Sequence, residues 1–325
     1  MTSGPVRFGG ASFPPTTEVV NLVNVVPSDL EALAALPRLR ELRITQTNPH
    51  ESPVGLPFDL EPLAALERLE VLVLPRLPID DLSPLRGLSR LREVDVGETQ
   101  VSDLAPLQGK ASLRTLRLRG TRVQTLEPLR GLTQLRLLDI AHTQVNDLSP
   151  LDGLPDLAEL HIEGSAVSDL APLRGLEHLS QLTLDRTPID SLEVLHTLTW
   201  FRTAKRLDLS GTRLADLTHV DSARAVTELF LFNTRVRDLT PLAHLSGLRV
   251  LRLDNAPVSD LAPLAALDGL QELSIAGTQV ADLSPVHGLR NLRSIDISGA
   301  PVAPAQVAAL RAARPAIEIL GSPAG

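Results

Sequence analysis

Histidines and carboxylates between residues 139 and 185 are the side chains whose types could hold a metal ion. His142, His161 and Glu163 would converge if their segments lay side by side, with Asp139 and Asp185 nearby. Their separations match neither the helical nor the tight-turn ligand spacing of a metal site. We therefore expect these residues to hydrogen-bond to one another, and we predict no metal.

Other catalytic chemistry finds little support in the sequence. The chain contains no Cys, which excludes thiolate catalysis, Cys-ligated zinc and disulfides. We find no nucleophile with a base and an orienting third group, and no Gly-rich loop placed to cradle a phosphate. The net charge is −8 with both signs mixed along the chain, whereas nucleic-acid binding needs a basic stripe. The sequence predicts no enzyme, no cofactor and no nucleic-acid partner.

An internal repeat determines which elements position every side chain. Residues Leu113 to Asp156 contain two copies of one 22-residue pattern, L-x-x-L-x-L-x-x-T-x-V-x-D-L-x-P-L-x-G-L-x-x. A fixed period of this length is the signature of a solenoid. Copies begin at Leu39, Leu69, Leu91, Leu113, Leu135, Leu157, Leu179, Ala204, Val226, Leu248, Leu270 and Leu292. Two longer steps place insertions at residues 48–59 and 199–203.

Each repeat predicts one strand and one short helical turn. The L-x-L part alternates apolar and polar residues, as a strand with one buried face does. In D-L-x-P-L, the Asp is a helix cap and the Pro fits the first turn, where no N–H is needed. Strands of successive coils must pair in parallel. Because the strand side packs more tightly, the stack should bend with its strands on the concave face.

This pattern resembles the leucine-rich-repeat family, in particular the 22-residue class of the internalins. The resemblance implies an α/β solenoid shaped as a horseshoe or arc of about 12 coils, with helical or 3₁₀ turns on the convex face. The family usually has Asn after the strand, whereas this chain has mostly Thr, as at Thr121 and Thr143. We expect a Thr ladder with fewer hydrogen bonds per rung. Lys110 stands at a Leu position, and its amine should reach water.

Caps and insertions complete the expected organisation. Residues 1–38 are interpreted as a flexible lead-in, to about residue 17, followed by a degenerate N-terminal cap coil. Residues 39–313 hold the repeats, and the regular helix predicted at 305–313 begins the C-terminal closure. Residues 314–325 form a closing strand and tail.

Two aromatic residues on one strand give the strongest candidate binding site. Strand alternation directs Leu229 and Leu231 inward, so Phe230 and Phe232 point to the solvent-exposed face of the sheet. Neighbouring strands add four side chains around them, namely Arg206, Asp208, Val250 and Arg252. Aromatic residues rimmed by Arg and Asp are typical of a protein-binding hot spot. Self-association, or rings that cover the nearby insertion, are the alternatives.

Two further apolar groups lie at the insertions. Trp200 and Phe201 either fill the irregularity made by their own insertion or extend an apolar patch at the rim of the sheet. Val71 and Val73, followed by Pro75, form a smaller patch near the N-terminus. The insertion at residues 48–59 would overhang this patch, either as a binding loop or as a lid.

The sequence therefore favours a non-catalytic scaffold that binds a protein partner on its concave face, as the family resemblance also implies. The alternatives are a delivered effector or toxin-neutralising protein that acts by binding, and a self-assembling structural protein. The N-terminal residues contain no apolar segment of a secretory signal, and no apolar run is long enough to span a membrane. We expect a cytoplasmic location.

Overall fold

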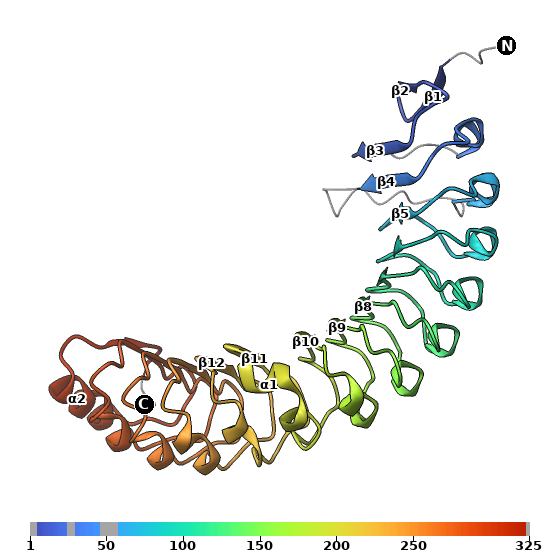
Figure 1. Cartoon of the computed structure of the whole chain (residues 1–325). Coiled ribbons are helices and arrows are strands. Elements are labelled where there is room, and N and C mark those ends of the chain that lie inside the picture. The colour runs from blue at the N-terminus through green and yellow to red at the C-terminus, as the bar shows by residue number, and fades with distance from the viewer. Residues whose placement is uncertain (1–4, 25–29, 46–57, 323–325) are drawn as a thin grey trace. The chain divides into compact units, whose positions relative to one another are not determined.

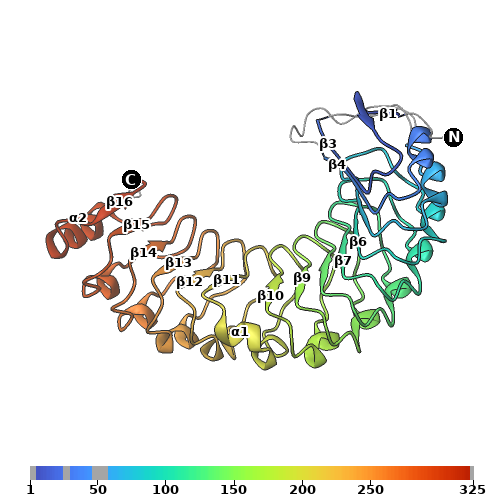
Figure 2. The same cartoon turned by 45° about the horizontal axis from the view of Figure 1, so that its top comes forward.

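Two compact units make up the chain in the computed structural model, Met1–Leu182 and Thr183–Gly325 (Figure 1). The structure describes residues 5–24, 30–45 and 58–322. In each unit, coils stack so that the strands form one side, here called the strand face (Figures 1 and 2). Short helical turns form the opposite side, called the turn face. This is the predicted leucine-rich-repeat architecture.

The first unit contains an eight-stranded parallel sheet in which the strands follow chain order. These strands are β3 (Val19–Val23), β4 (Glu41–Thr45), β5 (Val71–Val73), β6 (Glu93–Asp95), β7 (Thr115–Arg117), β8 (Leu137–Asp139), β9 (Glu159–His161) and β10 (Gln181–Thr183). The second unit contains a six-stranded sheet, again in chain order. Its strands are β11 (Arg206–Asp208), β12 (Glu228–Phe230), β13 (Val250–Arg252), β14 (Glu272–Ser274), β15 (Ser294–Asp296) and β16 (Glu318–Leu320).

The turn face of the described coils consists of short 3₁₀ helices. They are η1 (Glu31–Ala35), η2 (Glu61–Ala65), η3 (Ser83–Leu85), η4 (Ala105–Leu107), η5 (Glu127–Leu129), η6 (Ser149–Leu151), η7 (Ala171–Gly175), η8 (Leu195–Thr197), η9 (Val220–Ser222), η10 (Thr240–His244), η11 (Ala262–Leu264) and η12 (Ser284–Val286). The α-helices are α1 (Thr199–Thr203), within the predicted insertion, and α2 (Pro304–Ala313). Strand β16 pairs in parallel with β15.

The repeat sets the register of the sheets. Thr115, Leu116 and Arg117 of β7 lie opposite Leu137, Leu138 and Asp139 of β8, one repeat further along the chain. Leu116 and Leu138 are completely buried. Identical leucines therefore stack in columns and form an aliphatic core. The alternate side chains form columns on the strand face, which is why the pattern alone locates the outward residues.

Asp residues begin the 3₁₀ turns as predicted. The Asp103 carboxylate accepts a hydrogen bond from the Ala105 N–H at 2.8 Å, and Asp260 accepts one from Ala262 at 2.8 Å. Ser and Thr substitute in two coils, where Thr125 Oγ1 accepts from Glu127 N–H at 3.2 Å. Each acceptor satisfies one N–H that the short helix leaves unpaired.

A ladder of buried hydroxyl groups follows the strands. It consists of Thr99, Thr121, Thr143, Ser165, Thr187, Thr212, Thr234 and Thr278, each at most 5% exposed. Thr121 Oγ1 donates to the Leu118 carbonyl at 2.6 Å, and Thr234 Oγ1 donates to the Leu231 carbonyl at 2.7 Å. Each Thr hydroxyl of the ladder thus bonds to the carbonyl three residues earlier in its own coil, and so holds the chain as it leaves the strand.

Two sequence predictions differ from the structure. Lys110 is only 4% exposed, so the expectation that its amine reaches water was wrong. Its Nζ instead donates to the carbonyls of Leu88 at 3.0 Å and Arg86 at 3.2 Å. The N-terminal lead-in is also more ordered than expected, because β1 (Val6–Phe8) and β2 (Ala11–Phe13) form an antiparallel hairpin with Phe8 buried. Most of the insertion at 48–59 lies outside the described residues.

Candidate functional site

Phe230 and Phe232 lie on the strand face of the second unit. Phe230 ends β12 and Phe232 follows two residues later, while Leu229 and Leu231, which alternate with them, are fully buried. Both Phe rings are half-buried, as outward residues of a sheet lined by neighbouring strands should be. The predicted alternation of this segment is confirmed.

Arg206 covers the Phe230 ring. Its guanidinium carbon lies 4.4 Å from the ring centroid, within cation–π distance. The same guanidinium approaches Asp208 at 3.6 Å and Glu228 at 4.0 Å. Because the Arg206 side chain is 63% exposed, these contacts orient the cation without removing it from solvent. It can still bind a further group.

The next strand completes the surface. Arg252 lies opposite Phe230 in the register of β12 and β13, and Val250 lies opposite Glu228. The Arg252 guanidinium is 3.3 Å from the Glu272 carboxylate. The six residues named from the sequence at this position therefore lie on adjacent strands. We call them the aromatic patch: Arg206, Asp208, Phe230, Phe232, Val250 and Arg252.

Trp200 and Phe201 do not belong to this surface. Trp200 is 9% exposed and Phe201 is completely buried, and both lie in α1. Of the two interpretations left open by the sequence, the structure supports the packing role, in which the rings fill the space made by the three extra residues. The alternative, in which both rings extend an apolar patch that a partner could contact, does not agree with their burial.

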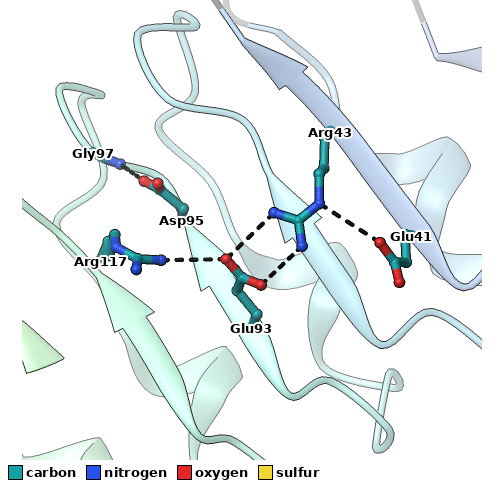
Figure 3. A network of polar contacts seen from close by, with 6 residues as sticks. All are labelled: Glu41, Arg43, Glu93, Asp95, Gly97 and Arg117. Atoms are coloured by element: carbon teal, nitrogen blue, oxygen red, sulfur yellow. Dashed lines mark hydrogen bonds and ion pairs between the residues drawn. The ribbon is translucent and has the colours of Figure 1, made fainter. Parts of the chain in front are cut away.

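An ion-paired network occupies the strand face of the first unit (Figure 3). Glu93 of β6 is held between Arg43, at 3.0 Å, and Arg117, at 3.2 Å. Arg117 comes from the adjacent strand β7, and Arg43 comes from β4, which lies beyond β5 on the other side. Arg43 also approaches Glu41 at 3.6 Å. Arg119 pairs with Glu163 in the same way. The arginines on this face therefore have carboxylate partners within their own unit.

Asp95 and Asp139 lie opposite Arg117 in the sheet register, one on each neighbouring strand. Each carboxylate turns to its own backbone, Asp95 accepting from Gly97 N–H and Asp139 from Ala141 N–H, both at 3.0 Å (Figure 3 shows Asp95). Burial raises the pKa of both carboxyl groups, because desolvation disfavours the ionised form. They line a recess of about 190 Å³ bounded also by Pro75, Arg76, Gly97, Glu98, Arg117 and Arg119.

The smaller N-terminal patch is less accessible than expected. Val73 is only 5% exposed and Val71 is half-buried. Val73 lies between Arg43 and Asp95 in the sheet register, and these longer side chains flank it. Val73 is therefore unsuited to direct partner contact, and the insertion proposed to overhang it falls largely outside the described residues.

His142, one of the residues considered for a metal site, packs against the next coil. His142 has a left-handed backbone, with φ of 56°, and its ring lies over Gly164 of the next coil. A Cβ atom at Gly164 would lie 2.3 Å from His142 Nδ1, so this position must remain Gly. Glu163 is engaged with Arg119. Within the described ranges, no group of three metal-binding side chains is present.

Comparisons with known proteins agree with this architecture. A family profile described as "Leucine Rich repeats (2 copies)" matches residues 111–153. No curated protein sequence matches the chain. The internalin InlF of Listeria monocytogenes is similar in structure, with 22% identity, a TM-score of 0.64, and coverage of 97% of this chain and 84% of that chain. A leucine-rich-repeat protein of Leptospira interrogans has 16% identity and a TM-score of 0.63, covering 94% and 96%.

The functional domain of Listeria InlJ, which includes a cysteine ladder, is also similar. It shares 16% identity with a TM-score of 0.67, covering 90% of this chain and 66% of that chain. The chain is thus a leucine-rich-repeat solenoid that resembles the Listeria internalins in fold, with a buried Thr/Ser ladder. Proteins of this fold are typically non-catalytic and bind other proteins on extended surfaces. A search of the described part of the chain finds no helix with the length and apolarity to span a bilayer.

Sequence reasoning missed two features of these faces. It did not foresee that Glu93 pairs with both Arg43 and Arg117. It also placed Arg206 beside the aromatic patch without foreseeing its contact with the Phe230 ring. A charge tabulation across two columns would have found the Glu93 network.

Proposed function

We propose that this chain is a non-catalytic scaffold that binds a protein partner through the aromatic patch. One observation carries the proposal: two half-buried Phe rings share a strand face with a well-exposed Arg held 4.4 Å above one of them. In a chain with six Phe, one Trp and no Tyr, this concentration of outward aromatic side chains is unusual.

The chemistry of the patch fits a protein partner. Aromatic and Arg residues are enriched at the centres of protein interfaces, where they supply large contact areas and directed polar contacts. Completing the burial of one Phe side chain contributes up to about 1.5–3 kcal/mol. Arg206 and Arg252 each have a carboxylate beside them, so the positive charges around the rings are offset by negative charges before a partner binds.

Affinity capture with matched variants tests the proposal. Wild type, Phe230→Ser/Phe232→Ser and Arg117→Ala/Arg119→Ala serve as baits, since the last pair occupies the same two coil positions on β7. We expect a partner that wild type and the β7 variant retain equally, and that the Phe variant loses by about tenfold or more. Equal retention by all three baits would refute the role of the patch.

Two further parts of the proposal have separate tests. Light scattering across a concentration series distinguishes a partner-binding protein from a self-assembling one, because only the latter shows a mass that rises with concentration. We also place the protein in the cytosol, with which its Cys-free composition is compatible. Cell fractionation that finds the chain outside the cell would favour a delivered protein instead.

A further inference from the structure

The turn face of the second unit departs from the repeat pattern in two neighbouring coils. The turn D-L-x-P-L loses its Pro in both, with Val194 in one coil and His219 in the next. Helix α1, at the insertion of three extra residues, lies between these positions (yellow in Figure 1). His219 has a left-handed backbone with φ of 75°, a conformation that costs a non-Gly residue energy and is often retained for function.

Helix α1 is anchored so that one cation faces outward. Trp200 and Phe201 are buried in the stack, whereas Arg202, the next residue, is exposed. Arg202 Nε donates to the His196 carbonyl at 3.2 Å. This bond fixes the base of the guanidinium and leaves its two terminal nitrogens for another acceptor.

A pair of stacked histidines joins the two coils. The rings of His196 and His219 have centroids 4.2 Å apart and planes inclined by 17°. His196 Nδ1 is buried and has no hydrogen-bond partner among the described residues. Ring stacking, and not a bond at that nitrogen, therefore holds His196 in position at the edge of α1.

These side chains surround a pocket of about 390 Å³, which we call the turn-side pocket. It is lined by His196, Arg202, Asp221, Ser222 and Arg224. Within the described chain, neither Arg202 nor Arg224 forms an ion pair with a carboxylate. The pocket thus presents two guanidinium groups against one carboxylate. The Ser222 hydroxyl is already committed, since it donates to the His219 carbonyl at 2.7 Å.

We propose that the turn-side pocket binds a phosphate-type oxyanion, either free or as a phosphoryl group on a peptide side chain. Guanidinium groups recognise such anions through paired N–H donors, and an Arg is suited to a tetrahedral oxyanion in a way that a point charge is not. Asp221 opposes the anion by charge repulsion. The site lies on the opposite side of its unit from the aromatic patch, so it does not depend on the proposed protein partner.

Titration calorimetry on the full chain tests this assignment with three probes: inorganic phosphate, a short phosphoserine peptide and its unphosphorylated form. We compare wild type with Arg202→Gln/Arg224→Gln, with Asp221→Asn, and with the charge-matched control Arg235→Gln/Arg237→Gln, whose side chains are exposed elsewhere in the unit. We expect saturable binding of a phosphate-bearing probe that the first variant weakens by about tenfold or more. The control should leave it unchanged, and Asp221→Asn should strengthen it.

Tighter binding of the phosphopeptide than of phosphate would identify a phosphoryl group on a peptide as the source, whereas comparable binding would identify the free anion. The single variant Arg224→Gln guards against a folding defect, because Arg224 is exposed and should not be needed for stability. Absence of saturable binding to wild type would overturn the proposal. Equal weakening by the control pair would do so as well, since it would show that only net charge matters.

Discussion

Strands β7 and β12 occupy equivalent places in their coils, yet they present opposite chemistry. The last residue of the strand and the second residue after it are Arg117 and Arg119 for β7, but Phe230 and Phe232 for β12. The β7 arginines are paired with Glu93 and Glu163 from coils of the same unit. The β12 rings receive one cation, Arg206, above one face. One strand face therefore satisfies its own polar groups, while the other leaves half-buried apolar area, which we propose a partner covers.

This difference shows where function can be added to a repeat. Both strands bury equivalent leucines, such as Leu116 and Leu229, so the outward columns are free to vary without loss of the core. Ion pairs between neighbouring columns keep a face soluble. An aromatic pair instead leaves apolar area exposed, and this is the surface proposed here for binding.

The largest effect should come from the buried aromatic residue. Phe201→Ala removes a fully buried ring and should lower the free energy of unfolding by about 3–5 kcal/mol. Phe230→Ala, on the strand face, should cost about 1 kcal/mol or less. Urea denaturation of both variants measures the contrast. Similar losses from the two substitutions would mean that Phe230 belongs to the core.

Replacing the buried cation should stabilise the protein. Burial lowers the pKa of the Lys110 amine below its ordinary value of 10.5, so its charged form costs stability at neutral pH. Lys110→Leu restores the residue found at Leu88 and Leu132 and should stabilise by about 1–2 kcal/mol at pH 7.

The stability difference between Lys110→Leu and wild type should change with pH in a defined direction. Between the lowered folded pKa and 10.5, the unfolded chain binds more protons, so wild-type stability rises with pH. The advantage of Lys110→Leu over wild type should therefore shrink through that window. Urea midpoints at a series of pH values measure it. A constant difference between the two proteins would contradict the account of a charged, buried amine.

The hydroxyl ladder should contribute equally in both units. Thr121→Val and Thr234→Val each remove one hydrogen bond to a carbonyl while keeping the side-chain shape. Because the backbone N–H of Thr121 also contacts the Leu118 carbonyl, the loss should be modest, about 1 kcal/mol. Thermal or urea unfolding compares the pair. A much larger loss in one unit would show that the ladder has a different role there.

The smallest effect should come from the ion-paired face. Glu93→Gln breaks the contacts to Arg43 and Arg117, which are partly open to solvent. Such pairs contribute about 0–1 kcal/mol, and salt weakens them. Wild type and variant should therefore unfold at nearly the same urea concentration in high salt. A loss above about 2 kcal/mol would mark the network as a structural core.

Much of the fold could be predicted from the sequence because one pattern recurs with a nearly constant period. The strand positions, the Asp-initiated turns, the insertion that becomes α1 and the closing strand β16 all follow from local letters. The outward direction of Phe230 and Phe232 follows from alternation alone. The hairpin at residues 6–13 was not predicted, because strands of three residues are too short to show a recognisable alternation of apolar and polar residues.

Contacts between side chains of different columns were harder to predict. Arg117 lies opposite Asp95 in the sheet register, but its ion pair is with Glu93. The several rotatable bonds of an arginine side chain make this partner hard to predict from sequence. Lys110 bonds to carbonyls whose accessibility depends on the stacking of an earlier coil. The burial of Trp200 and Phe201 depends on how three extra residues are accommodated. These features depend on packing in three dimensions, which no spacing rule encodes.

Photo-crosslinking tests the central claim most directly. p-Benzoylphenylalanine replaces Phe230 in one protein and Arg117 in another, so the same probe occupies equivalent coil positions on β12 and β7. If the aromatic patch binds a partner protein, the probe at position 230 should form a covalent adduct with that protein, and the probe at position 117 should form none. An adduct from position 117 alone, or an adduct from 230 only with a second copy of this chain, would contradict it.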